Sequence, residues 1–408
     1  MRLIGVLLGI GMLSACQPVE APSSSGEAKA SVSGLADIEY VCNTVPKSYV
    51  YFETREANWG QACYQAKASI TNASDAGERL LVLETLLDAL YDPHVSLNTN
   101  SGLSPRLLSS GADYWIEGGE ITSVRPGSSA AAAGVTVGDR VLDINGEQMT
   151  QAALARVQPK GVTATQAQLD WALNAAGAGY RNNLRSLNVA RPGGAVSFEL
   201  GEPQPEWPGT YVTAQRYDDV LHLRLNNSLG DNGAGKAFLA ELDANSNAKA
   251  FIIDLRDTPG GGNTGNAEPM MGAFFDAPIV YQKIIPSDRD AYNRELKTIS
   301  AMFVDEPVVV LVGRWTGSMG EGMAVGFDGT GRARVMGARM AGLAGGVEEF
   351  KLPETGITLR LPTYDLAHLD GTPRHDWTPP VLLVADNGNG EDLALARALE
   401  WLGAQEAD

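Results

Sequence analysis

Two apolar runs, each followed at once by a glycine-rich turn, constrain the fold of this chain more than any other feature. The first reads FIIDLRDTPGGG over 251–262, and the second reads PVVVLVGRWTGSMGEG over 307–322. A short continuous run of large apolar residues is typical of a strand that is covered on both faces. The glycines allow the tight turn that follows each strand. The pattern therefore predicts two buried strands, each of which ends in a turn.

The residues around these runs alternate between strand and helix patterns. The stretches VLHLRL, ARVMG and PVLLVA also read as strands, while GKAFLAELDANS and EDLALARALEWLG read as helices. Such alternation favours a mostly covered sheet in an α/β domain. We place this domain at 208–405.

The segment before it, 105–203, has a different character. ITSVRPGSSAAAAGV and GDRVLDINGE are similar to a PDZ domain of the form found in secreted proteases. Gly134 and Gly138 flank the turn into the second strand, where positive φ is favourable only for glycine. The resemblance implies binding of an extended peptide by strand addition, often through a free C-terminus. The loop that would bind a carboxylate has no recognisable match near GADYWIEGG, and a helical stretch, QAQLDWALNAAGAGYRNNL, is inserted later.

The first residues are typical of a targeting segment. Arg2 precedes a short apolar stretch, and the segment ends in LSAC, which resembles a bacterial lipobox. We expect a signal peptide at 1–15, cleavage before Cys16, lipidation of Cys16 and a tether at 16–34. Gln17 favours the outer membrane of a bacterial envelope, on its periplasmic side. Ordinary secretion with an unmodified cysteine is the alternative.

Residues 35–95 have a helical pattern. Leucines at 80, 83, 87 and 90 share one face, and Asp75 with Glu78 is a plausible capping start. Once Cys16 is lipidated, Cys42 and Cys63 remain. In an oxidising compartment this pair indicates one disulfide.

Composition excludes several kinds of partner. The apolar fraction of 44% is ample for a packed core. The net charge is −18, and no run of Lys or Arg occurs, which argues against nucleic acid and against membrane contact beyond the lipid anchor. The four histidines are scattered, so we expect no metal site and no cofactor. The sequence gives no indication of oligomeric state.

The two glycine-rich turns, together with VMGARMAGLAGG, resemble the tail-specific, or C-terminal processing, serine protease family, which includes the tricorn core protease. In that family one buried strand ends in Asp-x-Arg-x-x-Pro-Gly-Gly and another ends in Ser-x-x-Glu. The resemblance covers nearly everything after the tether. It implies a multidomain α+β protein with an N-terminal helical domain, a PDZ-like domain and a C-terminal α/β protease domain of the crotonase/ClpP-like type.

Ser318 is the candidate nucleophile. A glycine-flanked serine that opens a helix exposes its hydroxyl and brings the positive helix end to the same spot. The Met319 N–H can donate to the oxyanion of an acyl-transfer intermediate. Gly260 or Gly261 of the other turn can supply a second donor.

The base of the tail-specific branch is a lysine 25 residues after the serine, but that position here is Leu343. Lys351 is the nearest substitute, and using it would break the match of the next strand. The tricorn-like branch uses a histidine before the PDZ domain, and LYDPHVSL matches it with His94. Pro93 stands where that branch has a serine. The alternative for His94 is a histidine that interacts with a helix end.

An acidic partner should orient His94. The tricorn-like branch has a late Glu near the segment here reading DGTPRHDWTPPV, which lacks one. Asp376 could replace it, and His375 beside it could belong to the site. Glu321 has either a catalytic role or only a favourable place in the first helical turn. His222 and His368 are expected to be strand and loop residues.

Two functions remain open. The first is a lipid-anchored serine endopeptidase that cleaves unfolded or extended polypeptides, with its site assembled when the helical domain docks. The second is an inactive protease homologue that acts as a PDZ peptide-binding scaffold in the cell envelope. The intact Ser318 and both glycine-rich turns favour the enzyme; Leu343, Pro93 and the missing late Glu favour the scaffold.

Overall fold

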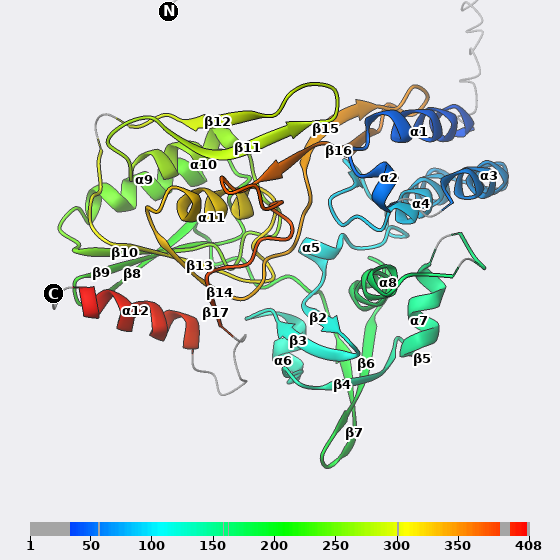
Figure 1. Cartoon of the computed structure of the whole chain (residues 1–408). Coiled ribbons are helices and arrows are strands. Elements are labelled where there is room, and N and C mark those ends of the chain that lie inside the picture. Colours follow the sequence, from blue (N-terminus) through cyan, green and yellow to red (C-terminus); the bar gives the residue numbers. More distant parts are fainter. Residues whose placement is uncertain are drawn as a thin grey trace, which may run out of the picture. The chain divides into compact units, whose positions relative to one another are not determined.

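The structure is a computed structural model that describes residues 33–55, 58–157, 159–161, 163–299, 302–383 and 392–405. All of them fall within one compact unit. The predicted signal peptide, Cys16 and nearly all of the predicted tether lie outside the described residues. No helix within these ranges is long and apolar enough to cross a membrane. The mixed helix and sheet architecture agrees with the multidomain α+β prediction (Figure 1).

The two apolar runs form the centre of a six-stranded sheet, as predicted. Its strands, in spatial order, are β17 (Val381–Leu382), β14 (Arg334–Gly337), β13 (Val308–Val312), β10 (Ala250–Asp254), β9 (Val220–Leu225) and β8 (Val212–Tyr217). All are parallel except β8, which forms an antiparallel edge. Because β10 and β13 are parallel neighbours, the turns that follow them meet at one end of the sheet.

Helices cover both faces of this sheet, so its central strands are buried on both sides. One face carries α9 (Ala234–Ala244), α10 (Thr264–Gly272) and α11 (Met319–Gly329), and the other carries α12 (Leu393–Gln405) (Figure 1). Apolar side chains of α12 pack against β9, β10 and β13. This burial explains the continuous apolar runs in the sequence.

A second, antiparallel sheet lies beyond α10 and α11, and the sequence reading had not predicted it as a sheet. It contains β1 (Ser96–Leu97), β16 (Thr358–Ala367), β11 (Ile279–Pro286) and β12 (Tyr292–Leu296), with β15 (Gly346–Lys351) also pairing with β16. Strand β1 follows the helical segment directly and pairs with β16 at Ser96–Arg360 and Leu97–Leu359. Strand pairing therefore joins the helical segment to the C-terminal α/β domain immediately after His94.

The helical segment contains α1 (Leu35–Ser48), α2 (Phe52–Arg55), α3 (Trp59–Ile70), α4 (Ala76–Leu87) and the short 3-10 helix η1 (Asp88–Leu90). Its core is not self-contained. Four fully buried residues of the protease domain complete it, namely Ala344, Leu352, Leu359 and Leu361. The buried carboxylate of Asp37 also accepts hydrogen bonds from the backbone of Glu354 and Thr355.

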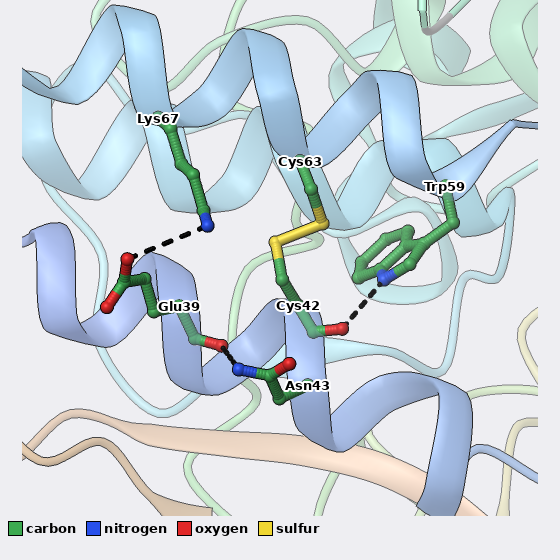
Figure 2. Close-up of a disulfide and its surroundings, with 6 residues drawn as sticks. All are labelled: Glu39, Cys42, Asn43, Trp59, Cys63 and Lys67. Atoms are coloured by element: carbon green, nitrogen blue, oxygen red, sulfur yellow. Dashed lines mark hydrogen bonds and ion pairs between the residues drawn. A yellow bond between two sulfur atoms is a disulfide. The ribbon is translucent and has the colours of Figure 1, made fainter.

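A disulfide joins Cys42 of α1 to Cys63 of α3 (Figure 2). Beside it, the Trp59 indole N–H donates to the Cys42 carbonyl at 3.2 Å, and Lys67 pairs with Glu39. The cross-link closes a loop of 21 residues, which lowers the entropy of the unfolded chain. It holds together the two helices that pack on β16 and on α4.

The PDZ-like segment contains a third sheet. Its strands, in spatial order, are β2 (Tyr114–Glu117), β3 (Glu120–Val124), β4 (Arg140–Ile144), β6 (Arg185–Arg191) and β7 (Gly194–Leu200), and β5 (Glu147–Gln148) pairs with β4. Its helices are α5 (Leu108–Gly111), α6 (Ser129–Ala133), α7 (Met149–Arg156) and α8 (Gln166–Ala178). The inserted helical stretch predicted from the sequence is α8.

Helix α8 occupies the outer edge of β2. The side-chain amide of the buried Asn174 accepts from the Ile116 N–H and donates to the Ile116 carbonyl, both at 2.8 Å. These are the two bonds that a paired strand would make. Gly177 lies so close to the Tyr114 ring that an added Cβ would approach the ring atoms to about 3 Å. Strand addition at β2, as expected for peptide capture, therefore requires α8 to move away.

We predict that Asn174→Leu opens this edge. The substitution leaves the buried N–H and C=O of Ile116 without partners, which should lower the free energy of unfolding by about 1–3 kcal/mol. Urea denaturation measures that loss, and hydrogen exchange should become faster at the Ile116 amide. Asn43→Leu, on the exposed surface of α1, is the control. Unchanged exchange at Ile116 would show that Asn174 does not hold α8 on the strand.

Candidate active site

Ser318 stands between β13 and α11, in the turn that the sequence analysis singled out. Its backbone has φ 50° and ψ −109°, an unusual conformation for a residue with a side chain. Strain of this kind persists only where the surroundings fix it, and it is concentrated at functional sites. Here the Ser318 N–H donates to the Glu321 carboxylate at 2.7 Å. The serine is thus held at the start of a buried helix.

The histidine predicted as base lies against this serine. His94 Nε2 is 3.0 Å from Ser318 Oγ, and His94 Nδ1 is 2.8 Å from the carbonyl oxygen of Ala344. A carbonyl can only accept a hydrogen bond, so Nδ1 carries the proton. The lone pair of Nε2 then faces the serine hydroxyl. This is the tautomer that a general base for Ser318 needs.

Asp92 fixes the turn that carries His94. One carboxylate oxygen accepts from the His94 backbone N–H at 2.9 Å. The other accepts from the Tyr49 hydroxyl at 2.6 Å and pairs with Arg55 at 3.1 Å. Burial raises the pKa of Tyr49 well above its usual range, so its hydroxyl stays a donor. The helices before the site therefore determine where His94 lies.

The prediction that Asp376 orients His94 is wrong. Its side chain is 68% exposed, and its carboxylate lies 3.8 Å from His375 Nε2. The position facing His94 Nδ1 is filled by the Ala344 carbonyl instead. The ring of His375 packs edge to face against that of Tyr51.

Glu321 is fully buried and serves as an acceptor for backbone amides. Besides the Ser318 N–H, it accepts from Gly342 at 2.8 Å and from Leu343 at 3.1 Å. Burial raises its pKa to about 7, although Arg374 and these amides favour the charged form. Among the described residues, no hydrogen bond or ion pair joins Glu321 to His94. Glu321 instead links the serine turn to the segment 342–345.

Two residues that the sequence analysis did not single out complete the site. Arg374 is almost completely buried, and its guanidinium donates to the carbonyls of Leu343 at 2.9 Å and Gly345 at 3.0 Å. Ala344 lies between them and offers its carbonyl to His94. Arg374 lies in the segment DGTPRHDWTPPV, where the resemblance implies an acid, and a cation there has no sequence signal for a role at a histidine.

Of the oxyanion donors predicted from the sequence, Met319 follows Ser318 directly and Gly261 faces the Ser318 side chain. Met319 is the first residue of α11, so its N–H has no acceptor within the helix. The Gly261 N–H, in contrast, donates to the Thr258 carbonyl at 3.1 Å in this conformation. In the described part of the chain no hydrogen bond uses the Gly260 N–H. Met319 and Gly260 therefore stay the predicted pair of donors, because their N–H groups are free of acceptors among the described residues in this conformation.

The remaining titratable candidates lie elsewhere. Buried His222 pairs with Asp254 on β10, as a strand residue would, and His368 contacts Asp328 and Asp370 in a turn. Lys351 is an exposed residue of β15. Within the described ranges no group of three or more His, Cys, Asp or Glu could hold a metal ion.

Known proteins share these domains and this fold. The family described as Peptidase family S41 matches residues 219–379, and a PDZ domain matches 120–157. A carboxyl-terminal-processing protease of Picosynechococcus sp. is 23% identical over 299 residues, covering 71% of this chain and 67% of that protein. Mature CPAF superposes with a TM-score of 0.57 and 16% identity over 91% of this chain and 95% of its own. The photosystem II D1 C-terminal processing protease superposes with a TM-score of 0.53 and 17% identity over 92% of this chain and 98% of its own.

We predict that Gly261→Ala disables the site. Gly261 has φ +66°, and an added Cβ would lie 2.5 Å from the Cβ of Ser318, so the serine or the turn must shift. A displacement of this size should slow reaction of Ser318 with an active-site label by about 10²-fold. Gly331→Ala, at φ +69° with open space around it, shares the backbone strain and should keep the rate. Equal rates for both variants would exclude a close approach of the two turns.

The pKa of His94 predicts a pH profile. Burial lowers it from the ordinary value of 6.5, with Arg374 and Arg55 acting in the same direction and the Ala344 carbonyl and Asp92 opposing them. The neutral, basic form therefore persists as the pH falls to 6.5 and below. Labelling rates between about pH 4.5 and about pH 8 should fall on the acid side with a midpoint below 6.5. A midpoint near 7 would instead assign the fall in labelling rate to protonation of Glu321.

Proposed function

We propose that this chain is a serine endopeptidase that cleaves unfolded or extended polypeptides by acyl transfer, because its residues 219–379 match peptidase family S41. Ser318 is the nucleophile and His94 is the general base. The observation that carries the proposal is the 3.0 Å contact between His94 Nε2 and Ser318 Oγ, with the opposite ring nitrogen held by a carbonyl.

The chemistry follows from this geometry. Ser318 Oγ attacks the scissile carbonyl carbon while its proton passes to His94 Nε2. The tetrahedral oxyanion lies at the start of α11, where the Met319 and Gly260 amides and the helix dipole stabilise it. His94 then gives the proton to the departing amine, and the acyl-serine remains. Water, activated by the same histidine, releases the acid and restores Ser318.

A PDZ domain beside a peptidase domain supports a polypeptide as substrate. The two parts are in direct contact near the nucleophile turn. The Trp315 indole N–H donates to the Ala112 carbonyl at 2.8 Å, and the buried Arg125 pairs with Asp257 at 2.6 Å. Capture of a substrate C-terminus at the PDZ-like domain would require α8 to leave β2.

The cellular setting is a proposal from the sequence. We propose a lipid anchor at Cys16 that holds the enzyme in the bacterial envelope, on the periplasmic side and in the outer membrane. The disulfide between Cys42 and Cys63 fits an oxidising compartment.

The proposal predicts that a fluorophosphonate labels Ser318 and that His94 accelerates the reaction. The full chain in mild detergent is treated with the label, and the adduct is located by peptide mass spectrometry. Ser318→Ala should give no adduct, and His94→Gln should react about 10³-fold more slowly because general-base assistance is lost. Cleavage of an unfolded polypeptide should fall in parallel.

His368→Gln is the matched control, because it also removes a buried histidine but one outside the site. It should keep the labelling rate even if its melting temperature falls. A folded protein without any Ser318 adduct would favour the scaffold function instead. An adduct formed equally fast in His94→Gln would remove His94 as the base.

A further inference from the structure

The group that orients the base is unusual for a serine hydrolase. In a triad a carboxylate accepts a hydrogen bond from the Nδ1–H group of the histidine and stabilises its charged form. Here the acceptor is the backbone oxygen of Ala344, at 2.8 Å. A backbone carbonyl orients a ring only as well as the segment that carries it is fixed. Whatever fixes the segment 342–345 is therefore part of the catalytic geometry.

Arg374 fixes the carbonyl side of that segment. Its Nη2 donates to the oxygens of Leu343 and Gly345, the residues immediately before and after Ala344. Its own backbone N–H donates to the Leu366 carbonyl of β16 at 2.7 Å, which anchors the arginine to the second sheet. A planar guanidinium with several donors suits such a double contact better than an ammonium does.

Glu321 fixes the amide side of the same segment. It accepts from the N–H groups of Gly342 and Leu343, and also from that of Ser318. The Ala344 side chain is fully buried in the core of the helical segment. With its neighbours held from both sides, the Ala344 carbonyl has one direction in which to point, toward His94.

We propose that Arg374 is a positioning residue for the catalytic base: by holding the carbonyls on both sides of Ala344, it fixes the orientation and tautomer of His94, which a triad acid does in other serine hydrolases. The inference rests on the proposed function, since it concerns the same base. It also explains how the site dispenses with the late Glu that the sequence lacks. Arg374 acts through Ala344 and touches neither the substrate nor Ser318.

Charged groups from several elements surround His94. Asp92 lies beneath its backbone, Arg55 comes from α2, Arg374 lies beyond the segment 342–345, and Glu321 is buried in α11. An acid as orienting group would favour the imidazolium, whereas the cation of Arg374 disfavours it. Loss of Arg374 removes that charge but also frees the Ala344 carbonyl, and these two changes move the pKa of His94 in opposite directions. The ring tautomer depends on the direction of the carbonyl, so it is the signature of the positioning role.

A merely structural role can be separated by a matched variant. Arg332 also donates to three backbone carbonyls, those of Phe274, Val304 and Glu306. It follows the far end of α11, roughly 16 Å along the helix from Ser318. Arg332→Met should therefore lower stability as Arg374→Met does, but without changing the base.

The test compares Arg374→Met, Arg374→Lys and Arg332→Met in the full chain. Fluorophosphonate labelling of Ser318 is measured, and the tautomer of the His94 ring is followed by nitrogen-15 NMR. Arg374→Met should label about 10²-fold more slowly because the base is misplaced, and its His94 ring should lose the preference for a proton on Nδ1. Arg374→Lys keeps the charge but not the double contact, so it should show both changes, whereas Arg332→Met should show neither.

Each outcome decides the proposal. A labelling rate within threefold of the unchanged protein in folded Arg374→Met would overturn it. So would a drop of equal size in Arg332→Met, because the effect would then be one of stability. If the unchanged protein gives no adduct at all, the proposed function fails. The NMR spectra still test Arg374 in that case, since an unchanged His94 tautomer in Arg374→Met would contradict the positioning role.

Discussion

The hydrogen bond from His94 Nδ1 to the Ala344 carbonyl is the contact on which the arrangement of the site depends. It joins residues 250 positions apart in the chain. One belongs to the helical segment and the other to the loop before β15, and Ser318 follows a third segment. The bond selects the ring tautomer, and the tautomer decides whether Nε2 can take a proton from the serine. The nucleophile alone, however well placed, is a weak one.

Apolar packing makes this polar contact possible. Ala344, Leu352, Leu359 and Leu361 of the protease domain lie in the core of the helical segment. Burying a leucine-sized side chain contributes about 1.5–3 kcal/mol, whereas one hydrogen bond contributes a net ~1 kcal/mol. The hydrophobic interface therefore supplies the docking energy, and β1 and Asp92 turn that docking into a position for His94. The polar groups determine the geometry of the site, and the apolar core stabilises it.

Much of this could be predicted from the sequence, because strand ends and glycine turns leave local patterns. Ser318, His94 and the glycine turn lie together as such patterns indicated. Asp376 was a wrong choice, since a backbone carbonyl has no sequence signature and any residue type can supply one. Arg374 was overlooked for the same reason: its partners are carbonyls, so no complementary charge marks it. The closed edge of β2 depends on one asparagine of an inserted helix, which no local pattern reveals.

The most direct test of the account is the protonation state of the His94 ring at rest. Nitrogen-15 NMR of the histidine-labelled protein near neutral pH distinguishes the two neutral tautomers, and His94→Gln assigns the signals. The account predicts a proton on Nδ1 and an unprotonated Nε2, since a carbonyl can only accept. A proton on Nε2, or a charged ring at that pH, would leave Ser318 without a base and would contradict the mechanism.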